Sequence, residues 1–277
     1  MSEDTAPAYG APNGAGVYDF LLGGRDNTTA DRDLAAKLTA EGYAGLPDLV
    51  RAHRRFVLKS VTWLASLGIA QFVDGGCGKP SGPSVHVTAR AALPGARVAY
   101  ADIDPQAVLH TSLSLGDAAP GVTAVLADIR HPGILLDHPA VRDVIRPGER
   151  TAVLLTGTVA GMTAAEARAV VAGFTARLAP GSAVVISCAL YTDRALGEKM
   201  ARLFAAAAQG PEWRNHAISD VESSFDGLLV EEGWPAHVGR WPMLPSGFAP
   251  AGQVIGGVGF KPSAPGRDAR MHARPVA

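Results

Sequence analysis

The sequence has little cysteine, no surplus of charge and no long apolar run. Two cysteines in 277 residues are too few for a disulfide framework, so a reducing cytoplasm is the expected compartment. A net charge of −1 lacks the basic surplus with which proteins attract nucleic acids or anionic membranes. No apolar run approaches the roughly 18 residues that span a bilayer, and the N-terminus has neither the basic nor the apolar region of a signal peptide. We therefore expect a cytoplasmic protein that binds a small molecule or another protein, and neither nucleic acid nor membrane.

The two ends of the chain differ in composition from the rest. Residues 1–15 and 262–277 are rich in alanine, proline and glycine and show no periodicity, which predicts two disordered tails. From Leu49 to Leu67, apolar residues recur at helical spacing with basic residues between them. We interpret residues 16–67 as an N-terminal helical extension and residues 68–261 as the main domain.

Short apolar segments alternate with amphipathic ones through the middle of the chain. The apolar segments are too continuous to face water on one side, as is typical of parallel strands covered by helices on both faces. This alternation predicts a doubly wound, mostly parallel, Rossmann-like α/β sheet. The expected strands are residues 69–74, 97–102, 122–128, 152–157, 183–188, 237–241 and 253–260, the last two forming an antiparallel pair at the sheet edge. The expected helices between strands are residues 84–93, 105–115 and 164–178.

A glycine-rich loop, FVDGGCGKPSG, follows the first expected strand at residues 72–82. Ligands of doubly wound sheets bind beyond the carboxyl ends of the strands, so this loop is the expected place for a ligand site. It does not fit a phosphate-binding P-loop, because Pro80 replaces the required Ser or Thr and supplies no amide. A dinucleotide site remains an alternative: Gly76 and Gly78 fit G-x-G-x-x-G, but Ser81 occupies the third position.

The same loop fits D-x-G-x-G, which suits S-adenosylmethionine (SAM). Asp74 would bind the α-ammonium of SAM, and the glycines would let the backbone approach its ribose and methionine parts. Lys79 then has no expected role. Asp102, ending the next strand, could accept hydrogen bonds from the ribose hydroxyls, and Asp128, after the third strand, from the adenine amine. Each acid alone is commonly a turn or cap residue, but acids at three successive strand ends favour an adenosine ligand.

The run VYDFLLGGRDN at residues 17–27, followed by Ala30-Asp31-Arg32, resembles the N-terminal signature of the actinobacterial S-adenosyl methyltransferase family, formerly known as a domain of unknown function. The resemblance extends over about residues 16–261. It also includes Arg51-x-x-Arg54-x-Phe56, the Asp74 loop, Val85-His86, Asp102-x-Asp104-Pro105, Ala127-Asp128, Ala179-Pro180-Gly181, Phe225-Asp226-Gly227 and Gly256-Gly257-Val258-Gly259. It implies a class I methyltransferase fold of seven strands, the last antiparallel, with SAM as cofactor and S-adenosylhomocysteine as product.

The resemblance also implies roles for individual residues. The cofactor-binding residues would be Asp74, Gly75, Gly76, Gly78, Asp102, Ile103, Asp128, Ile129, Thr156 and Gly157, the last two beside the methyl donor. The extension would close over the ligand as a lid, with Tyr18, Arg25, Asp26 and Asn27 as lid or substrate residues. Arg51 and Arg54, on the basic face of the helix that follows, could approach the methionine carboxylate, with surface charge as their alternative role. Methyl transfer requires an acceptor held in line with the methyl group, and a base only where the acceptor must lose a proton. His86, which opens the helix after the loop, is the candidate base, with packing or capping as its alternative role. No residues have metal-ligand spacing.

Several positions depart from the pattern that the family commonly has. Asn is usual where this chain has His53, Glu at Val87, His-Phe at Ala160-Gly161, and His at Cys188. Polar groups near the strand ends are therefore lost, whereas the acids expected at the cofactor are kept. We expect a SAM-dependent methyltransferase acting on a small molecule. The alternatives are a SAM-binding protein without turnover, acting as a sensor or partner subunit, and an NAD-dependent oxidoreductase.

Overall fold

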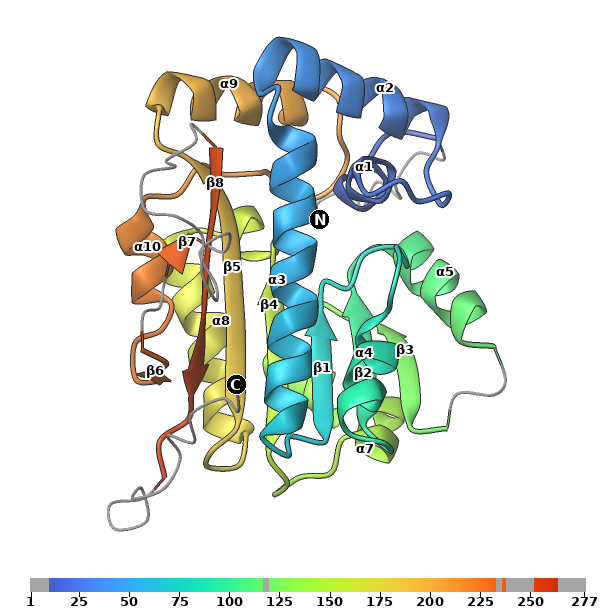
Figure 1. Ribbon diagram of the computed structural model, residues 1–277, viewed down its shortest axis with the longest axis vertical. Helices are drawn as coiled ribbons and strands as arrows, with labels where there is room; N and C mark the ends of the chain where they lie inside the picture. Colours follow the sequence, from blue (N-terminus) through green and yellow to red (C-terminus); the bar gives the residue numbers. More distant parts are fainter. Residues whose placement is uncertain (1–9, 117–119, 233–235, 238–251, 264–277) are drawn as a thin grey trace, which may run out of the picture.

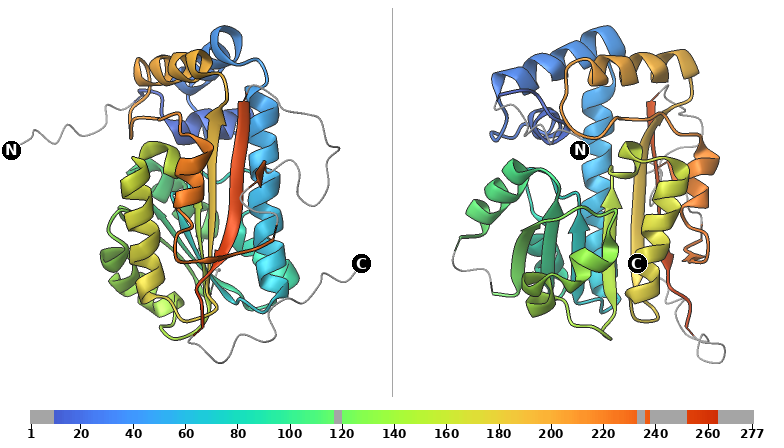
Figure 2. Two further views of the ribbon diagram at one scale, coloured as in Figure 1. Left: turned by 90° about the vertical axis from the view of Figure 1, so that its left-hand side faces the viewer. Right: turned by 180° about the vertical axis from the view of Figure 1, so that it is seen from behind.

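The computed structural model describes residues 10–116, 120–232, 236–237 and 252–263 of the chain. One mixed sheet lies between two layers of helices, and further helices lie over one end of the sheet (Figures 1 and 2). The helices are α1 (Gly14–Leu21), α2 (Thr29–Lys37), the π-helix η1 (Leu38–Gly42), α3 (Leu46–Ser66), α4 (Val85–Ala92), α5 (Pro105–Leu115), α6 (Pro132–Asp137), α7 (Pro139–Val144), the 3₁₀ turn η3 (Val159–Gly161), α8 (Ala164–Arg177), α9 (Arg194–Ala205) and α10 (Ile218–Ser223). The strands are β1 (Gln71–Gly75), β2 (Arg97–Asp102), β3 (Val122–Leu126), β4 (Thr151–Thr156), β5 (Ala183–Tyr191), β6 (Leu229–Val230), β7 (Ala236–His237) and β8 (Gly252–Phe260).

The strands follow the order β3-β2-β1-β4-β5-β8-β6, with β7 pairing on β8 as well. Strands β1 to β5 pair in parallel, and β8 is antiparallel to β5, β6 and β7. This confirms the doubly wound, mostly parallel sheet with an antiparallel last strand. The strand order reverses between β1 and β4, so the loops at the carboxyl ends of these strands form the crevice in which such sheets bind ligands.

Successive residues of the central strands belong to two different hydrophobic cores. Phe72 is fully buried in the core beneath α3 and α4, whereas its neighbour Val73 is fully buried in the core beneath α6, α7, α8 and α10. Figure 2 shows α3 and α8 on opposite faces of the sheet. Strands covered on both faces have no polar side, and this explains the continuous apolar segments in the sequence.

Helix α3 is part of the layer of helices that covers one face of the sheet, although it precedes the first strand. Pro47 lies in its first turn, where a proline disrupts no backbone hydrogen bond. Its apolar side, which includes Phe56 and Val57, is buried, and the helix packs against β5 and β8. The expected extension therefore has two parts. Helices α1, α2 and η1 form, together with α9, a cap over the carboxyl ends of the strands (Figure 1). Helix α3 packs on the sheet instead. None of the helices in the described part of the chain is long and apolar enough to cross a membrane.

Some expected boundaries are corrected. Strand β5 runs on to Tyr191 because its antiparallel pairing with β8 continues to Gly252. Strand β8 lies between β5 and the short strands β6 and β7, and its antiparallel pairing with β7 confirms the expected antiparallel pair at this edge of the sheet. The expected N-terminal tail is shorter than 1–15, because Asn13 caps α1 through a hydrogen bond from the amide of Gly16. Residues 1–9, 264–277 and most of the expected strand 237–241 lie outside the described residues.

Candidate active site

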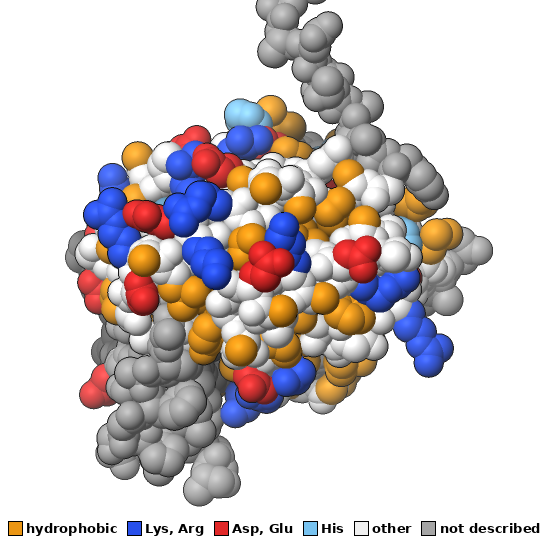
Figure 3. Space-filling model, turned by 90° about the horizontal axis from the view of Figure 1, so that it is seen from above, with side chains coloured by type: hydrophobic (Ala, Val, Ile, Leu, Met, Phe, Trp, Pro, Cys, Tyr) orange, Lys and Arg blue, Asp and Glu red, His pale blue; other side chains and the backbone are white. Residues whose placement is uncertain are grey.

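A cleft of about 1340 Å³ opens at the carboxyl ends of the parallel strands, between the strand-end loops and the cap. Its walls come from α1, the first half of α3, the loops after β1 to β4, α9 and residues 208–214. Figure 3 looks down on this end of the molecule, where acidic and basic side chains alternate with apolar ones. Of the residues predicted from the sequence, the cleft is lined by Tyr18, Arg54, Asp74, Gly76, Gly78, Asp102, Ile103, Asp128, Ile129, Thr156 and Gly157.

Asp74, in β1, lines this cleft, and its carboxylate accepts no hydrogen bond from the described residues. The residue is 7% exposed. Burial raises the pKa of Asp74 to about 6, the positive charge of Arg54 opposes that rise, and the negative charge of Asp102 adds to it. A buried carboxylate without a donor is costly unless a ligand supplies one, so Asp74 suits a cationic ligand group.

The glycine loop passes close to the chain segment that follows β4. Gly76 has a φ of +76°, and a Cβ atom there would lie 2.1 Å from Cγ2 of Thr158, so only glycine fits. The amide of Gly78 donates to Oδ2 of Asp102 across 2.8 Å, and the amide of Asp104 donates to Oδ1 across 2.9 Å. Burial raises the pKa of Asp102, and these backbone hydrogen bonds oppose the rise. Asp102 thus fixes the loop at the end of β2 and keeps lone pairs for further donors.

Asp128, after β3, has a different environment. Its carboxylate accepts from Nε of Arg130, and the two side chains form an ion pair at 2.6 Å. Burial alone would raise the pKa of Asp128, but the hydrogen bonds and charge of Arg130 outweigh it and hold the pKa below its usual value. Asp128 therefore stays ionised and can accept a donor from the cleft.

Two buried acids join the cap to the glycine loop. Asp19, in α1, is fully buried and accepts from the Ser81 hydroxyl at 2.5 Å. Asp31, in α2, lies 3.9 Å from Nζ of Lys79, and both side chains are almost fully buried. The sequence suggested no role for Lys79. In the structure its ammonium is buried against the cap, so the residue helps to join the cap to the loop. Both acids belong to the N-terminal signature, and that signature was the available signal for them.

A chain of hydrogen bonds crosses the cleft wall from α1 to β5. The Tyr18 hydroxyl lies 2.8 Å from Nδ1 of His53, and Nε2 of His53 lies 2.8 Å from Oγ of Ser187. Burial, helped by the charge of Arg54, lowers the pKa of His53 to about 4, and burial raises the pKa of Tyr18. Both are therefore neutral near pH 7. The His53 ring also packs on Gly157, with Cε1 3.5 Å from the position of a Cβ atom there.

Other predicted residues lie outside the cleft lining. His86 contacts Tyr100, whose hydroxyl is 2.9 Å from Nδ1 of His86, and its backbone amide donates to the same hydroxyl. This is the packing and capping alternative for His86. Arg51 pairs with Asp48 on the surface of α3. The remaining residues outside the lining are Gly75 in β1 and Arg25, Asp26 and Asn27 of the signature; among these, the amide of Asp26 and the side chain of Asn27 donate to Asp19.

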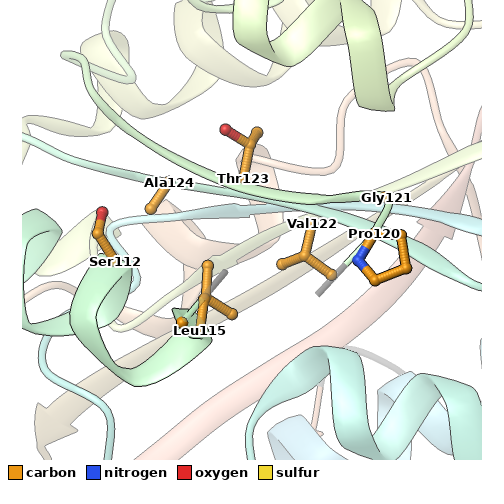
Figure 4. A pocket seen from close by; sticks show the side chains of 8 residues that line it. Ser112, Leu115, Pro120, Gly121, Val122, Thr123 and Ala124 are labelled. Carbon is orange, nitrogen blue, oxygen red and sulfur yellow. The ribbon is translucent and has the colours of Figure 1, made fainter. Parts of the chain in front are cut away.

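Cys188 and a second hollow add no chemistry to the cleft. Cys188 is fully buried, and burial raises the pKa of its thiol to about 12, so it stays protonated. In the described part of the chain, no group of His, Cys, Asp or Glu side chains is arranged to hold a metal ion. A hollow of about 440 Å³ lies between α5 and β3, and none of the described residues that line it has a charged side chain (Figure 4).

The comparisons with known proteins identify the family. The family model described as S-adenosyl methyltransferase matches residues 6–248. The chain belongs to this family. A crystal structure of a candidate methyltransferase from Thermobifida fusca is 31% identical, covers 92% of this chain and 97% of its own, and superposes with a TM-score of 0.84. A DUF574 family protein from Streptomyces avermitilis is 29% identical over 91% of this chain and 98% of its own, with a TM-score of 0.81.

More distant structures share only the fold. The geranyl diphosphate C-methyltransferase of Streptomyces coelicolor is 14% identical, covers 91% of this chain and 90% of its own, and has a TM-score of 0.51. No curated protein matches the sequence. The family is one of SAM-dependent methyltransferases, and its cofactor is SAM.

The cleft residues fit the polar groups of SAM. Two polar atoms of the cleft walls are buried without a hydrogen-bond partner among the described residues, namely Nε of Arg54 and Oγ1 of Thr158. An unpaired guanidinium nitrogen beside an unpaired carboxylate matches an amino-acid group, which carries one charge of each sign. Thr158 was not predicted from the sequence, since no pattern distinguishes it from other loop residues.

Proposed function

We propose that the protein is a methyltransferase that transfers the methyl group of SAM to a small molecule held in the apolar part of the cleft. The observation that carries the proposal is the buried Asp74 carboxylate, which faces the cleft without a donor. Asp74 binds the α-ammonium of SAM, and Arg54 binds the carboxylate of its methionine part. Bidentate or charge-assisted bonds of this kind fix orientation as well as affinity.

The acids after β2 and β3 hold the adenosine part. Both Asp102 oxygens accept one backbone amide each, and the remaining lone pairs accept from the ribose hydroxyls. Asp128, kept ionised by Arg130, accepts from the adenine amine. SAM supplies a methyl group on a positively charged sulfur, and Thr156 and Gly157 at the end of β4 place it beside the acceptor. Helices α1 and α9 of the cap line this space, and a covered site favours a displacement that needs close, aligned reactants.

Calorimetry tests the proposal at the level of the cofactor. SAM and S-adenosylhomocysteine should bind, whereas NAD and ATP should not. Binding of NAD without SAM would show that the loop serves a dinucleotide and that the protein is an oxidoreductase. A second experiment incubates the protein with methyl-labelled SAM and a metabolite extract. Label transferred to a small molecule supports the enzyme, and tight SAM binding with no transfer to any component favours the binding protein without turnover.

A further inference from the structure

The cleft extends beyond the region around the three acids, and one part of this extension has apolar walls. The apolar residues of the lining include Leu46, Leu49 and Val50 of α3, Met200 and Phe204 of α9, and Trp213. Sites of this composition bind apolar ligands and fix their orientation with a few polar groups. One polar residue of the same lining is Tyr18, whose hydroxyl is at the end of the hydrogen-bond chain through His53 to Ser187.

The available donors and acceptors determine which group donates in each of these two hydrogen bonds. Ser187 is fully buried, and His53 is the partner of its hydroxyl among the described residues. If Nε2 of His53 carried the ring proton, the Ser187 proton would be buried without an acceptor, which is unfavourable. If Ser187 instead donates to Nε2, the ring proton is on Nδ1 and donates to the Tyr18 oxygen. Ser187 and His53 are then satisfied, and the proton of Tyr18, a residue of the cleft lining, is left to donate to a ligand.

Among the residues that the structure describes, the acceptor side of the cleft offers no base. His53 is neutral with a pKa of about 4, and its Nε2 lone pair is taken by Ser187 in this arrangement. The charges that act on Tyr18 are those of Arg54 and Asp74, both of which the proposed function assigns to SAM. The remaining cleft acids have donors of their own: Asp104 caps α5, Glu166 caps α8, and Glu212 pairs with Arg214. The cleft is therefore poorly suited to a methyl acceptor that must lose a proton during the reaction.

We propose that the Tyr18 hydroxyl, oriented by His53 and Ser187, donates a hydrogen bond to an anionic oxygen of the methyl acceptor, and that the acceptor is an apolar small molecule carrying a carboxylate or a comparably acidic hydroxyl. The inference rests on the proposed function. In the transfer, one oxygen–carbon bond forms as the sulfur–carbon bond breaks, and the electron pair of the broken bond stays on sulfur. The negative oxygen and the positive sulfur both become neutral, and no proton moves. His53 and Ser187 are positioning residues, because they act through Tyr18.

The tautomer of His53 tests the first half of the inference without any ligand. Long-range proton–nitrogen NMR correlations distinguish a proton on Nδ1 from one on Nε2, and the signals are assigned by their loss in His53→Gln. We expect the Nδ1-protonated, neutral ring at pH 7. A ring protonated on Nε2 would reverse the chain, leave Tyr18 as an acceptor only, and overturn the inference even if SAM binds.

Probe binding to the protein saturated with S-adenosylhomocysteine tests the second half. The probes are 2-naphthoate, which carries a carboxylate, and 2-(aminomethyl)naphthalene, a cation of similar shape. We expect 2-naphthoate to bind at least about ten-fold more tightly than the amine, and Tyr18→Phe to weaken 2-naphthoate about ten-fold, as the loss of one charge-assisted hydrogen bond implies, with no effect on the amine. The matched control is Tyr100→Phe, which removes another histidine-bound tyrosine hydroxyl outside the cleft lining and should leave both affinities unchanged.

The outcomes separate the two proposals. If S-adenosylhomocysteine does not bind, the proposed function fails. A second outcome is that S-adenosylhomocysteine binds equally to the wild type and to Tyr18→Phe. If 2-naphthoate then fails to bind, or binds both proteins with the same affinity, only the inference about the acceptor fails. Stronger binding of the amine than of the carboxylate would overturn it as well.

Discussion

The hydroxyl of Ser81 donates to the carboxylate of Asp19 across 2.5 Å and so joins the glycine loop to helix α1. Asp19 is fully buried, and its other oxygen accepts from the amide of Asp26 and the side chain of Asn27. The signature of the N-terminal segment therefore has a structural explanation. It surrounds one buried carboxylate that fixes the cap on the loop predicted to hold the cofactor.

Ser81→Ala should destabilise the protein through this carboxylate. The substitution leaves Oδ1 of Asp19 buried without its donor, and such a loss costs about 1–3 kcal/mol of unfolding free energy. Urea unfolding measures the change. The control is Ser66→Ala, because Ser66 is exposed at the end of α3, and there a change within about 0.5 kcal/mol is expected. Equal stability of the two variants would contradict the assigned role of Asp19.

Lys79→Met should destabilise the protein more than Lys59→Met does. Lys79 and Asp31 are a buried pair, and removing one charge of such a pair costs roughly 3 kcal/mol because the other stays uncompensated. Methionine is unbranched and only one atom shorter than lysine, so most of the loss reports the charge. Lys59 is exposed on α3 and serves as the matched control. An unchanged midpoint of urea unfolding for Lys79→Met would show that Asp31 does not need this ammonium.

The parts of the fold that local patterns specify were predictable from the sequence. Strand β2 and helix α5 have the expected bounds, because an apolar run ends at Asp102 and Asp104 precedes Pro105, which gives a cap followed by a proline in the first turn. The acids at the ends of β1, β2 and β3 were found for the same reason: alternation of strands and helices places strand ends along one edge.

Contacts between distant segments were not predictable in this way. His53 and Ser187 are 134 residues apart, and no periodicity or motif pairs a helix residue with one strand among several. The burial of Lys79 depends on how α2 folds over the loop, since the same lysine in an uncovered loop would face water. His86 shows the converse, because a histidine at a helix start near a ligand loop attracts a functional interpretation, yet the Tyr100 hydroxyl engages it outside the cleft lining.

Gly76→Ala should impair both stability and SAM binding, and Gly82→Ala separates the two causes. Both glycines have positive φ, +76° and +66°, but a Cβ at Gly82 meets no atom within 4 Å, whereas at Gly76 it collides with Thr158. Gly82→Ala should therefore cost about 1–2 kcal/mol from backbone strain, and Gly76→Ala more. The double variant Gly76→Ala with Thr158→Ala removes the colliding methyl group and should recover part of the loss in urea unfolding and calorimetry. If neither stability nor SAM affinity recovers in the double variant, the loss in Gly76→Ala comes from backbone strain alone.

Asp74→Asn should raise the stability of the ligand-free protein and lower its affinity for SAM. Burial raises the pKa of Asp74 from 3.8 to about 6. Between these two values the native state holds a proton that the unfolded state has lost, so unfolding free energy falls as pH rises through this window. The cost is complete above pH 6 and amounts to about 3 kcal/mol at most, and Asp74→Asn removes it. Asp33→Asn, at an exposed position of α2, should change neither stability nor its pH dependence.

The affinity for SAM should have the opposite dependence on the same carboxylate. The α-ammonium binds the ionised form, so the wild-type affinity should increase from pH 5 to pH 7 and then level off as Asp74 ionises. Asp74→Asn should weaken SAM at least about 30-fold at pH 7, since it leaves a buried charge without its counter-charge, and should abolish this pH dependence. Calorimetry at several pH values measures both effects. A variant that is less stable than the wild type yet binds SAM equally well would show that Asp74 has a structural role and does not contact the cofactor.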